Sequence, residues 1–261
     1  MTATLFEPAP FVRKVEEAAR AGGWTINHLS PTPSSPRPWL QRAARTKRAA
    51  NVKTPRFYLS SGIHGDEVAG PLAVLEMLRI PDFFDAVEAT IFPILNPEGL
   101  ARRTRVNLDN VDLNRDYKNT KSEEIRGHLA VLPTLGRFDV AMMLHEDFEG
   151  AGAYLYELND GLIPELGFRI IAAMGQHVPI DGRPVIEEVP AHGGILQREE
   201  LIRKMGPIED RPEWPEAIYL SVNHTKVSYT TETPMLVPIE QRVAAQVAAV
   251  RTVIETLAST I

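Results

Sequence analysis

The chain has 261 residues, of which 44% are hydrophobic and 24% charged, and this length allows one large domain with a sizeable core or two smaller domains. Its formal net charge of -6 argues against a nucleic-acid partner, because phosphate contacts need a basic surface. There is no cysteine, which excludes disulfides, cysteine nucleophiles and cysteine-ligated zinc. The N-terminus lacks the apolar run of a signal peptide, and no segment approaches membrane-spanning length. We therefore expect a cytoplasmic protein that has no membrane partner, and the composition leaves its oligomeric state unknown.

Helical and strand-like segments alternate along most of the chain. In chain order, the patterns predict a helix over Pro10–Ala21, a loop over Ser30–Pro38, a strand over Arg56–Ser61, a helix over Glu67–Leu78, a strand over Ala89–Leu95, a helix over Thr120–Leu132, strands over Phe138–Leu144 and Ala153–Glu157, a helix over Leu166–His177, a long loop over Gly182–Glu216, a strand over Lys226–Thr231 and a helix over Ile239–Ala258. Thr120 and Glu123 form a candidate capping box for the third of these helices. Strands separated by helices predict an α/β fold with a mixed, mostly parallel sheet and helices on both faces.

Polar side chains follow four of the predicted strands. His64 and Glu67 come after the first strand, Asn96 after the second, His145 after the third and Glu232 after the last. In open α/β sheets, ligands bind at the carboxyl ends of the strands. We therefore expect these side chains to meet at one edge of the sheet.

The spacing of His64 and Glu67 suits a metal site. A histidine and a carboxylate three residues apart on a strand-to-helix turn can point to the same side. With a distant histidine, for which His145 is the best candidate, they would form a zinc site with an open position for water. Alone, the H-x-x-E pattern is more typical of a solvated turn, so its meaning depends on the neighbouring motifs.

Six short motifs occur in order along the chain: HGDE, NPEG, RRTR, NVDLNR, LHED and TETP. In this order they resemble the zinc carboxypeptidase family, and the resemblance runs from Arg56 to the C-terminus. It implies a single catalytic domain over residues 1–261 with a three-layer fold and a mixed, mostly parallel sheet of the eight-stranded type. It also implies zinc as the cofactor and a substrate that has a free carboxylate.

The resemblance implies a role for each matched residue of the catalytic centre. His64, Glu67 and His145 match the zinc ligands, and Glu232 matches the general base. Arg102 matches the arginine that stabilises the oxyanion, although Arg103 or Arg105 remains an alternative. A solvated strand end is the alternative interpretation of Glu232.

The same resemblance implies how the substrate is held. Asn114 and Arg115 match the pair that binds the terminal carboxylate, and Asp112 matches a carboxylate that orients a metal-bound histidine. A structural salt bridge is the alternative for Arg115. Tyr219 and Tyr229 are candidates for the tyrosine that assists substrate binding in part of the family, although neither lies in a matching motif. The acidic segment Glu146–Glu149 departs from the digestive enzymes and could favour substrates that carry an amine.

Three functions are compatible with these residues. The first is a metallocarboxypeptidase or a murein-peptide-amidase-like enzyme that cleaves an amide bond next to a free carboxylate. The second is an N-acyl amino acid deacylase of the aspartoacylase and succinylglutamate desuccinylase type, whose HGNE motif is similar to HGDE. Such deacylases usually carry an additional β-rich domain, for which 261 residues leave little room. The third is a catalytically idle binding protein, which is disfavoured because every expected catalytic position is present.

Overall fold

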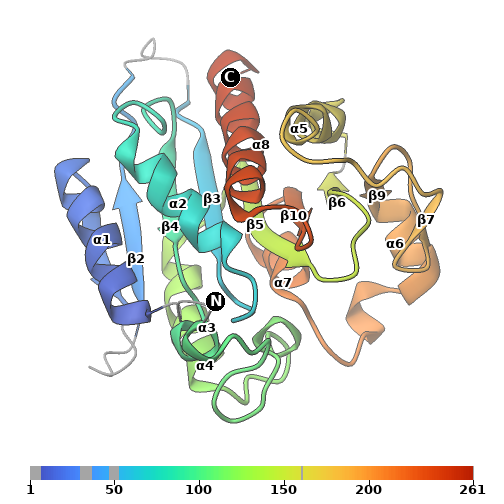
Figure 1. Ribbon diagram of the computed structural model, residues 1–261, viewed down its shortest axis with the longest axis horizontal. Coiled ribbons are helices and arrows are strands. Elements are labelled where there is room, and N and C mark those ends of the chain that lie inside the picture. The colour runs from blue at the N-terminus through green and yellow to red at the C-terminus, as the bar shows by residue number, and fades with distance from the viewer. Residues whose placement is uncertain (1–6, 30–36, 47–52, 160, 261) are drawn as a thin grey trace.

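A computed structural model describes residues 7–29, 37–46, 53–159 and 161–260 (Figure 1). Most of the predicted Ser30–Pro38 loop lies outside the described residues. The helices are α1 (Pro8–Ala21), α2 (Ala69–Arg79), α3 (Pro97–Arg102), α4 (Glu123–Val131), α5 (Leu166–Met174), α6 (Arg198–Met205), α7 (Glu216–Asn223) and α8 (Ile239–Thr260). Short 3-10 turns cover Leu113–Arg115, Leu132–Leu135 and Ile208–Asp210. The strands are β1 (Thr25–His28), β2 (Pro38–Arg42), β3 (Arg56–Ser61), β4 (Glu88–Phe92), β5 (Val140–Asp147), β6 (Tyr154–Asn159), β7 (Val185–Ile186), β8 (Val189–Pro190), β9 (Ile195–Gln197) and β10 (Val227–Pro234).

Eight strands form one mixed sheet in the order β1-β2-β4-β3-β5-β10-β6-β9. The four central strands β4, β3, β5 and β10 are parallel, and β6 runs antiparallel to β10. This arrangement confirms the predicted mixed, mostly parallel sheet. Because β3, β5 and β10 point the same way, the segments that follow them meet at one edge of the sheet.

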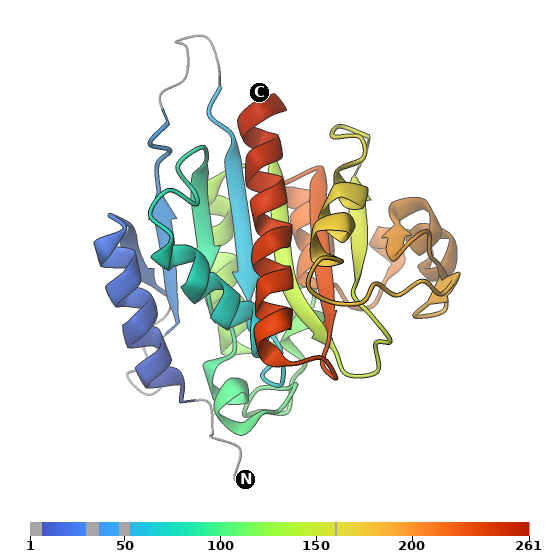
Figure 2. The same ribbon diagram turned by 45° about the horizontal axis from the view of Figure 1, so that its top comes forward.

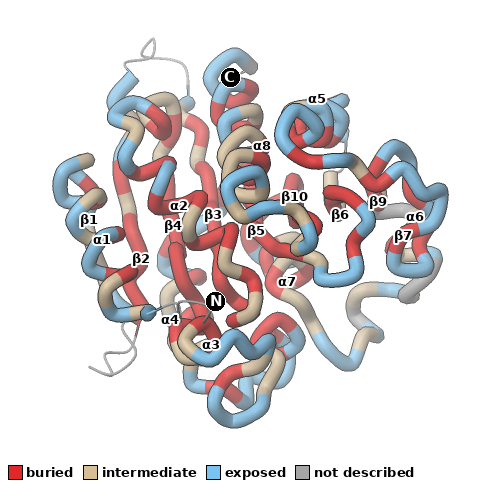
Figure 3. The backbone as a smooth tube through the Cα atoms, in the orientation of Figure 1, coloured by how far each residue is buried: buried red, intermediate tan, exposed pale blue. Residues whose placement is uncertain are grey.

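Helices cover both faces of the sheet, which makes three layers (Figure 2). On one face, α1, α2, α5 and α8 bury a large cluster that includes Leu59, Met142 and Val253. On the other face, Tyr58, Phe92 and Met143 pack under α4 and α7. Figure 3 accordingly shows the central strands as buried along their length. Strands covered on both faces need apolar residues at consecutive positions, which explains the unbroken hydrophobic runs in the sequence.

Two local predictions were wrong. Ser122, and not Thr120, caps α4, because its hydroxyl accepts the backbone N–H of Ile125 while Thr120 adopts a left-handed conformation with φ 55°. The predicted loop over Gly182–Glu216 contains the β7–β8 hairpin, β9 and α6. These elements are short, and part of their apolar surface is buried in a small cluster with β6 and α7, so the local sequence pattern is weak. In the described part of the chain, no helix has the length and apolarity that a membrane span requires.

Candidate active site

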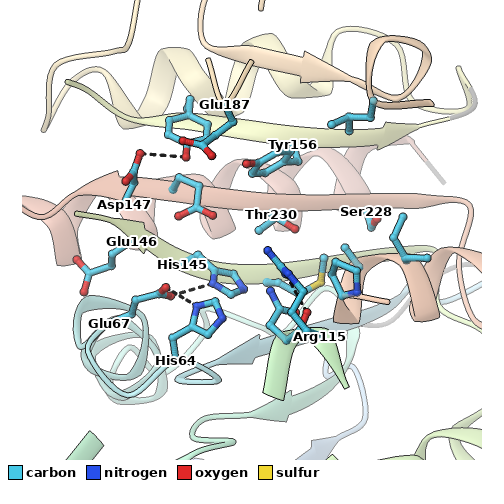
Figure 4. Close-up of a pocket in the computed structure, with 18 of the residues that line it drawn as sticks. His64, Glu67, Arg115, His145, Glu146, Asp147, Tyr156, Glu187, Ser228 and Thr230 are labelled. Atoms are coloured by element: carbon cyan, nitrogen blue, oxygen red, sulfur yellow. Dashed lines mark hydrogen bonds and ion pairs between the residues drawn. The ribbon is translucent and has the colours of Figure 1, made fainter. Parts of the chain in front are cut away.

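Three buried side chains bring potential metal ligands together at the carboxyl edge of the sheet (Figure 4). The ligand atoms of His64, Glu67 and His145 all lie within 4.8 Å of one another. His64 Nδ1 is 2.5 Å from Glu67 Oε1, and His145 Nδ1 is 2.8 Å from Glu67 Oε2. Two imidazole nitrogens thus face the two oxygens of one carboxylate. This donor set suits a divalent metal with three protein ligands and an open coordination position.

Glycines in two of the motifs bring the turns of this site into contact. A Cβ on Gly65 would lie 1.9 Å from the carbonyl carbon of Gly99, so the HGDE turn can approach the NPEG turn only without a side chain there. Asn96 begins the second turn as the N-cap of α3, where its Oδ1 accepts the N–H of Gly99 at 2.9 Å. The two motifs are therefore parts of one packed structure that holds His64 and Glu67.

Asp112 forms a hydrogen bond with the ring nitrogen of His64 that does not contact Glu67. His64 Nε2 donates to Asp112 Oδ1 at 3.2 Å, which leaves Nδ1 of the same ring facing Glu67 and the candidate metal position between the three ligands. Asp112 also accepts Arg105 Nε at 2.9 Å and the backbone N–H of Asn114 at 2.9 Å. A carboxylate in this place fixes both the tautomer and the orientation of a metal-binding histidine.

The charges of the site favour an ionised Glu67. Burial by itself acts to raise the pKa of this carboxyl, but the adjacent His145 and His64 lower it to about 2. Burial also acts to raise the pKa of Asp112, whereas the hydrogen bond and charge of His64, together with Arg105, hold it well below its usual range. Both carboxylates therefore remain negative at neutral pH, as metal binding requires.

Glu232 lies next to the metal position on the neighbouring strand. On β10 it is in register with His145 of β5 on one side and with Tyr154 of β6 on the other. Burial raises the pKa of Glu232 to about 8; the negative charges of Glu67 and Asp147 add to the rise, and His145 opposes it. A carboxyl whose pKa is near neutrality, on the strand next to that of His145, is suited to proton transfer.

Asn114 and Arg115 line the same pocket, which has a volume of about 250 Å³. Asn114 Oδ1 accepts the backbone N–H of Glu216 at the start of α7, at 2.9 Å. This contact leaves the amide N–H₂ of Asn114 available to a ligand. Arg115 is exposed, and its Nη1 donates to the backbone carbonyl of Asn114 at 2.9 Å.

The arginines of the RRTR motif occupy different places. Arg102 ends α3, is exposed and is absent from the pocket wall, whereas Arg105 lines the pocket. Arg105 Nη1 lies 3.8 Å from Glu67 Oε1. The chain turns between them because Arg103 terminates the helix in a left-handed conformation with φ 55°. Of the three arginines considered from the sequence, Arg105 is therefore the one beside the metal position.

Two pocket tyrosines were missed in the sequence. Tyr154 and Tyr156 of β6 line the pocket, whereas Tyr229 is fully buried and hydrogen-bonded to Asn159, and Tyr219 is absent from the pocket wall. Alternation along β6 could have identified them, because residues two apart in a strand lie on the same face.

In the acidic segment Glu146–Glu149, Glu146 is neutralised by an ion pair, whereas Asp147 lines the pocket and has no ion pair among the described residues. Glu146 is buried, forms an ion pair with Arg242 and accepts the backbone N–H of Ala69 at 2.7 Å. Asp147 accepts the Tyr154 hydroxyl at 3.1 Å. Figure 4 shows Asp147 at the side of the pocket near Glu187. Glu187 is a further carboxylate of the pocket wall, and it comes from the β7–β8 hairpin.

Comparisons with known proteins agree with this geometry. The model of the succinylglutamate desuccinylase/aspartoacylase catalytic domain matches residues 53–154. A candidate metallopeptidase from Shewanella denitrificans is similar over 92% of this chain and 87% of its own, with 25% identity and a TM-score of 0.76. A second candidate metallopeptidase, from Shewanella amazonensis, is 24% identical over 95% of this chain and 92% of its own, with a TM-score of 0.79. No curated protein matches the chain.

The matched domain model and the similar solved structures support a relation to the zinc carboxypeptidase-like superfamily. A metallo-carboxypeptidase from Burkholderia cenocepacia shares the fold, with a TM-score of 0.67 and 14% identity over 94% of this chain and 67% of its own. The proteins and the domain that this zinc carboxypeptidase-like chain resembles are hydrolases, so it is an enzyme of the same general class.

Proposed function

We propose that this protein is a zinc-dependent hydrolase that cleaves an amide bond adjacent to a free carboxylate, as a carboxypeptidase or a peptide amidase does. The observation that carries the proposal is one pocket that combines three kinds of group: the triad of His64, Glu67 and His145, the carboxyl of Glu232, and the pair Asn114 and Arg115. Two histidines and one glutamate without cysteine are a ligand set typical of catalytic zinc. When bound, zinc supplies a Lewis acid for the substrate carbonyl and acidifies water.

The polar groups of the pocket can bind the substrate in one orientation. Arg115 and the amide of Asn114 are suited to hold the substrate's carboxylate through charge-assisted hydrogen bonds. Arg105 lies beside Glu67, where its guanidinium can stabilise negative charge that develops on the carbonyl oxygen of the scissile bond. Placed in this way, the scissile amide bond lies between the carboxylate-binding pair and the triad.

Glu232 is the proposed general base. It faces the pocket beside His145 and can take a proton from the attacking water, then pass it to the leaving amine. With a cation bound at the triad, the pKa of Glu232 would be lower than in the metal-free protein, and its carboxyl would be ionised near neutral pH.

The second candidate is an N-acyl amino acid deacylase, and the matched domain model over residues 53–154 favours it. This segment contains the triad, Asp112, Asn114 and Arg115 but ends before Glu232. Both reactions release an amino acid that is held by its carboxylate, so they differ in the acyl group and not in the polar groups described above.

A substrate panel tests both candidates. Zinc-loaded enzyme is offered dipeptides, murein-type peptides, and N-acetyl and N-succinyl amino acids, each as the free acid and as the C-terminal amide. Cleavage of peptides supports the first candidate, and cleavage of the N-acyl amino acids alone supports the deacylase. Equal cleavage of acids and amides would contradict the carboxylate requirement in either case.

The role of Arg115 is tested on the same panel. Arg115→Ala should weaken free-acid substrates by up to about 2–5 kcal/mol in kcat/KM, the loss that is typical when the bound substrate buries the charge pair and one partner is removed. Amidated substrates should change little, because they carry no charge for Arg115 to bind. The matched control is Arg126→Ala, which removes an exposed arginine whose guanidinium donates to the backbone carbonyls of Thr120 and Lys121. An equal loss on both substrate forms would mean that Arg115 has a structural role.

A further inference from the structure

The pocket extends from the triad along three adjacent strands. Glu232, Thr230 and Ser228 lie on the same face of β10, because they are two residues apart, and all three line the pocket. Thr230 is in register with Met143 of β5 and Tyr156 of β6. Ser228 is in register with Leu158, which also lines the pocket. The floor therefore runs from the catalytic carboxyl past two hydroxyls, with Ser228 roughly 13 Å along the strand from Glu232.

Within the described part of the chain, the hydroxyl of Ser228 has no hydrogen-bond partner. The residue is 1% exposed, and none of the described residues hydrogen-bonds to its Oγ. Figure 4 shows Ser228 at the end of the row of pocket residues, beyond Thr230. Buried hydroxyls almost always have a hydrogen-bond partner, because leaving one unpaired costs free energy. A buried, unpaired hydroxyl in a pocket wall is therefore suited to a polar group of the ligand.

We propose that Ser228 and Thr230 select the side chain of the substrate's terminal residue, and that this side chain is long, uncharged and polar, as in glutamine. The inference rests on the proposed function, because it assumes that Asn114 and Arg115 hold the carboxylate of that same residue. The side chain then passes Thr230 towards Ser228, and its amide exchanges hydrogen bonds with the hydroxyls.

The surroundings of the two hydroxyls favour an uncharged group. Their neighbours across the strands are Met143, Tyr156 and Leu158, and Ile218 of α7 adds a further apolar side chain to the wall. Arg211, the remaining arginine of the pocket, already donates from its Nε and Nη2 to backbone carbonyls, those of Gly206 and Leu201. A charged group beside these apolar side chains would lose its hydration, and the donors of Arg211 named above already have acceptors, whereas an amide needs only hydrogen bonds.

The test measures binding of free amino acids to the zinc-loaded protein by calorimetry, which needs no turnover. Glutamine, glutamate and methionine are matched in size and differ in the polarity and charge of the side chain. Wild type should bind glutamine about 10-fold more tightly than methionine, the scale of one or two hydrogen bonds, and more tightly than glutamate. Ser228→Ala should reduce the preference for glutamine over methionine by about 5-fold.

Two further variants separate specificity from folding. Thr230→Ser retains a hydroxyl and should keep the preference for glutamine, whereas Thr230→Val keeps the shape and should reduce it. Ser221→Ala is the matched control, because Ser221 is half-buried in α7 and its hydroxyl is already paired with the carbonyl of Ile218. Melting temperatures of all variants show whether any of them is simply unfolded.

Two outcomes would overturn the inference: wild type binds methionine or glutamate as tightly as glutamine, or Ser228→Ala leaves the preference unchanged. Failure of the proposed function is a separate result, obtained with glutaminamide. If glutaminamide binds as tightly as glutamine, the carboxylate pair does not act as proposed, whatever the side-chain preference is.

Discussion

Replacing Asp112 with asparagine should weaken zinc binding although Asp112 is not itself a ligand. Its Oδ1 accepts His64 Nε2 and the backbone N–H of Asn114, and its Oδ2 accepts Arg105 Nε. Asparagine has the same size but only one oxygen and no charge, so at least one of these donors would face an N–H₂ group. The loss of such an orienting carboxylate typically reduces metal affinity 10- to 100-fold, or about 1.4–2.7 kcal/mol.

Zinc affinity is measured by competition with a chromogenic chelator at fixed pH and salt. Asp109→Asn is the matched control, because it removes one negative charge from an exposed residue of the same loop. The control should bind zinc as wild type does, and the melting temperature of the zinc-free protein should change little in either variant. Equal zinc affinity for Asp112→Asn and wild type would refute the proposed orientation of His64 through its second ring nitrogen.

Three further predictions concern catalysis and stability. Glu232→Gln should retain zinc and lower kcat by roughly 10² or more in a steady-state assay, and near-normal turnover would assign the base to another group. Arg105→Ala should lower kcat by about 10²-fold, while Arg102→Ala should leave it close to wild type; the reverse order would restore the assignment to Arg102. Burial lowers the pKa of His128 to about 3, so the folded protein holds this ring neutral while an unfolded chain binds a proton below pH 6.5. With decreasing pH below 6.5, His128 should therefore lower the free energy of unfolding, measured with urea and a chelator, by about 1.4 kcal/mol per pH unit. Wild type should show this slope in addition to that of His128→Asn, and parallel slopes would refute this pKa.

The amino-acid sequence by itself predicted the fold class and the three residues that meet as a candidate metal site. Strands buried on both faces need unbroken apolar runs, and such runs mark β3 and β5 in the amino-acid sequence. Because parallel strands end at the same edge of a sheet, the residues that follow these strands necessarily come close together. The position of His64, Glu67 and His145 in the chain therefore carries most of the information about the site.

Only the tertiary structure decided which neighbouring side chains face the pocket. Arg102 and Arg105 are three residues apart in one motif, and the left-handed conformation of Arg103 between them directs only Arg105 into the pocket. The floor formed by β5, β10 and β6 depends on strand register, which joins Ser228 to Leu158 although they are far apart in the sequence. Local propensity does not determine such pairings, because register results from the packing of whole strands against a shared core.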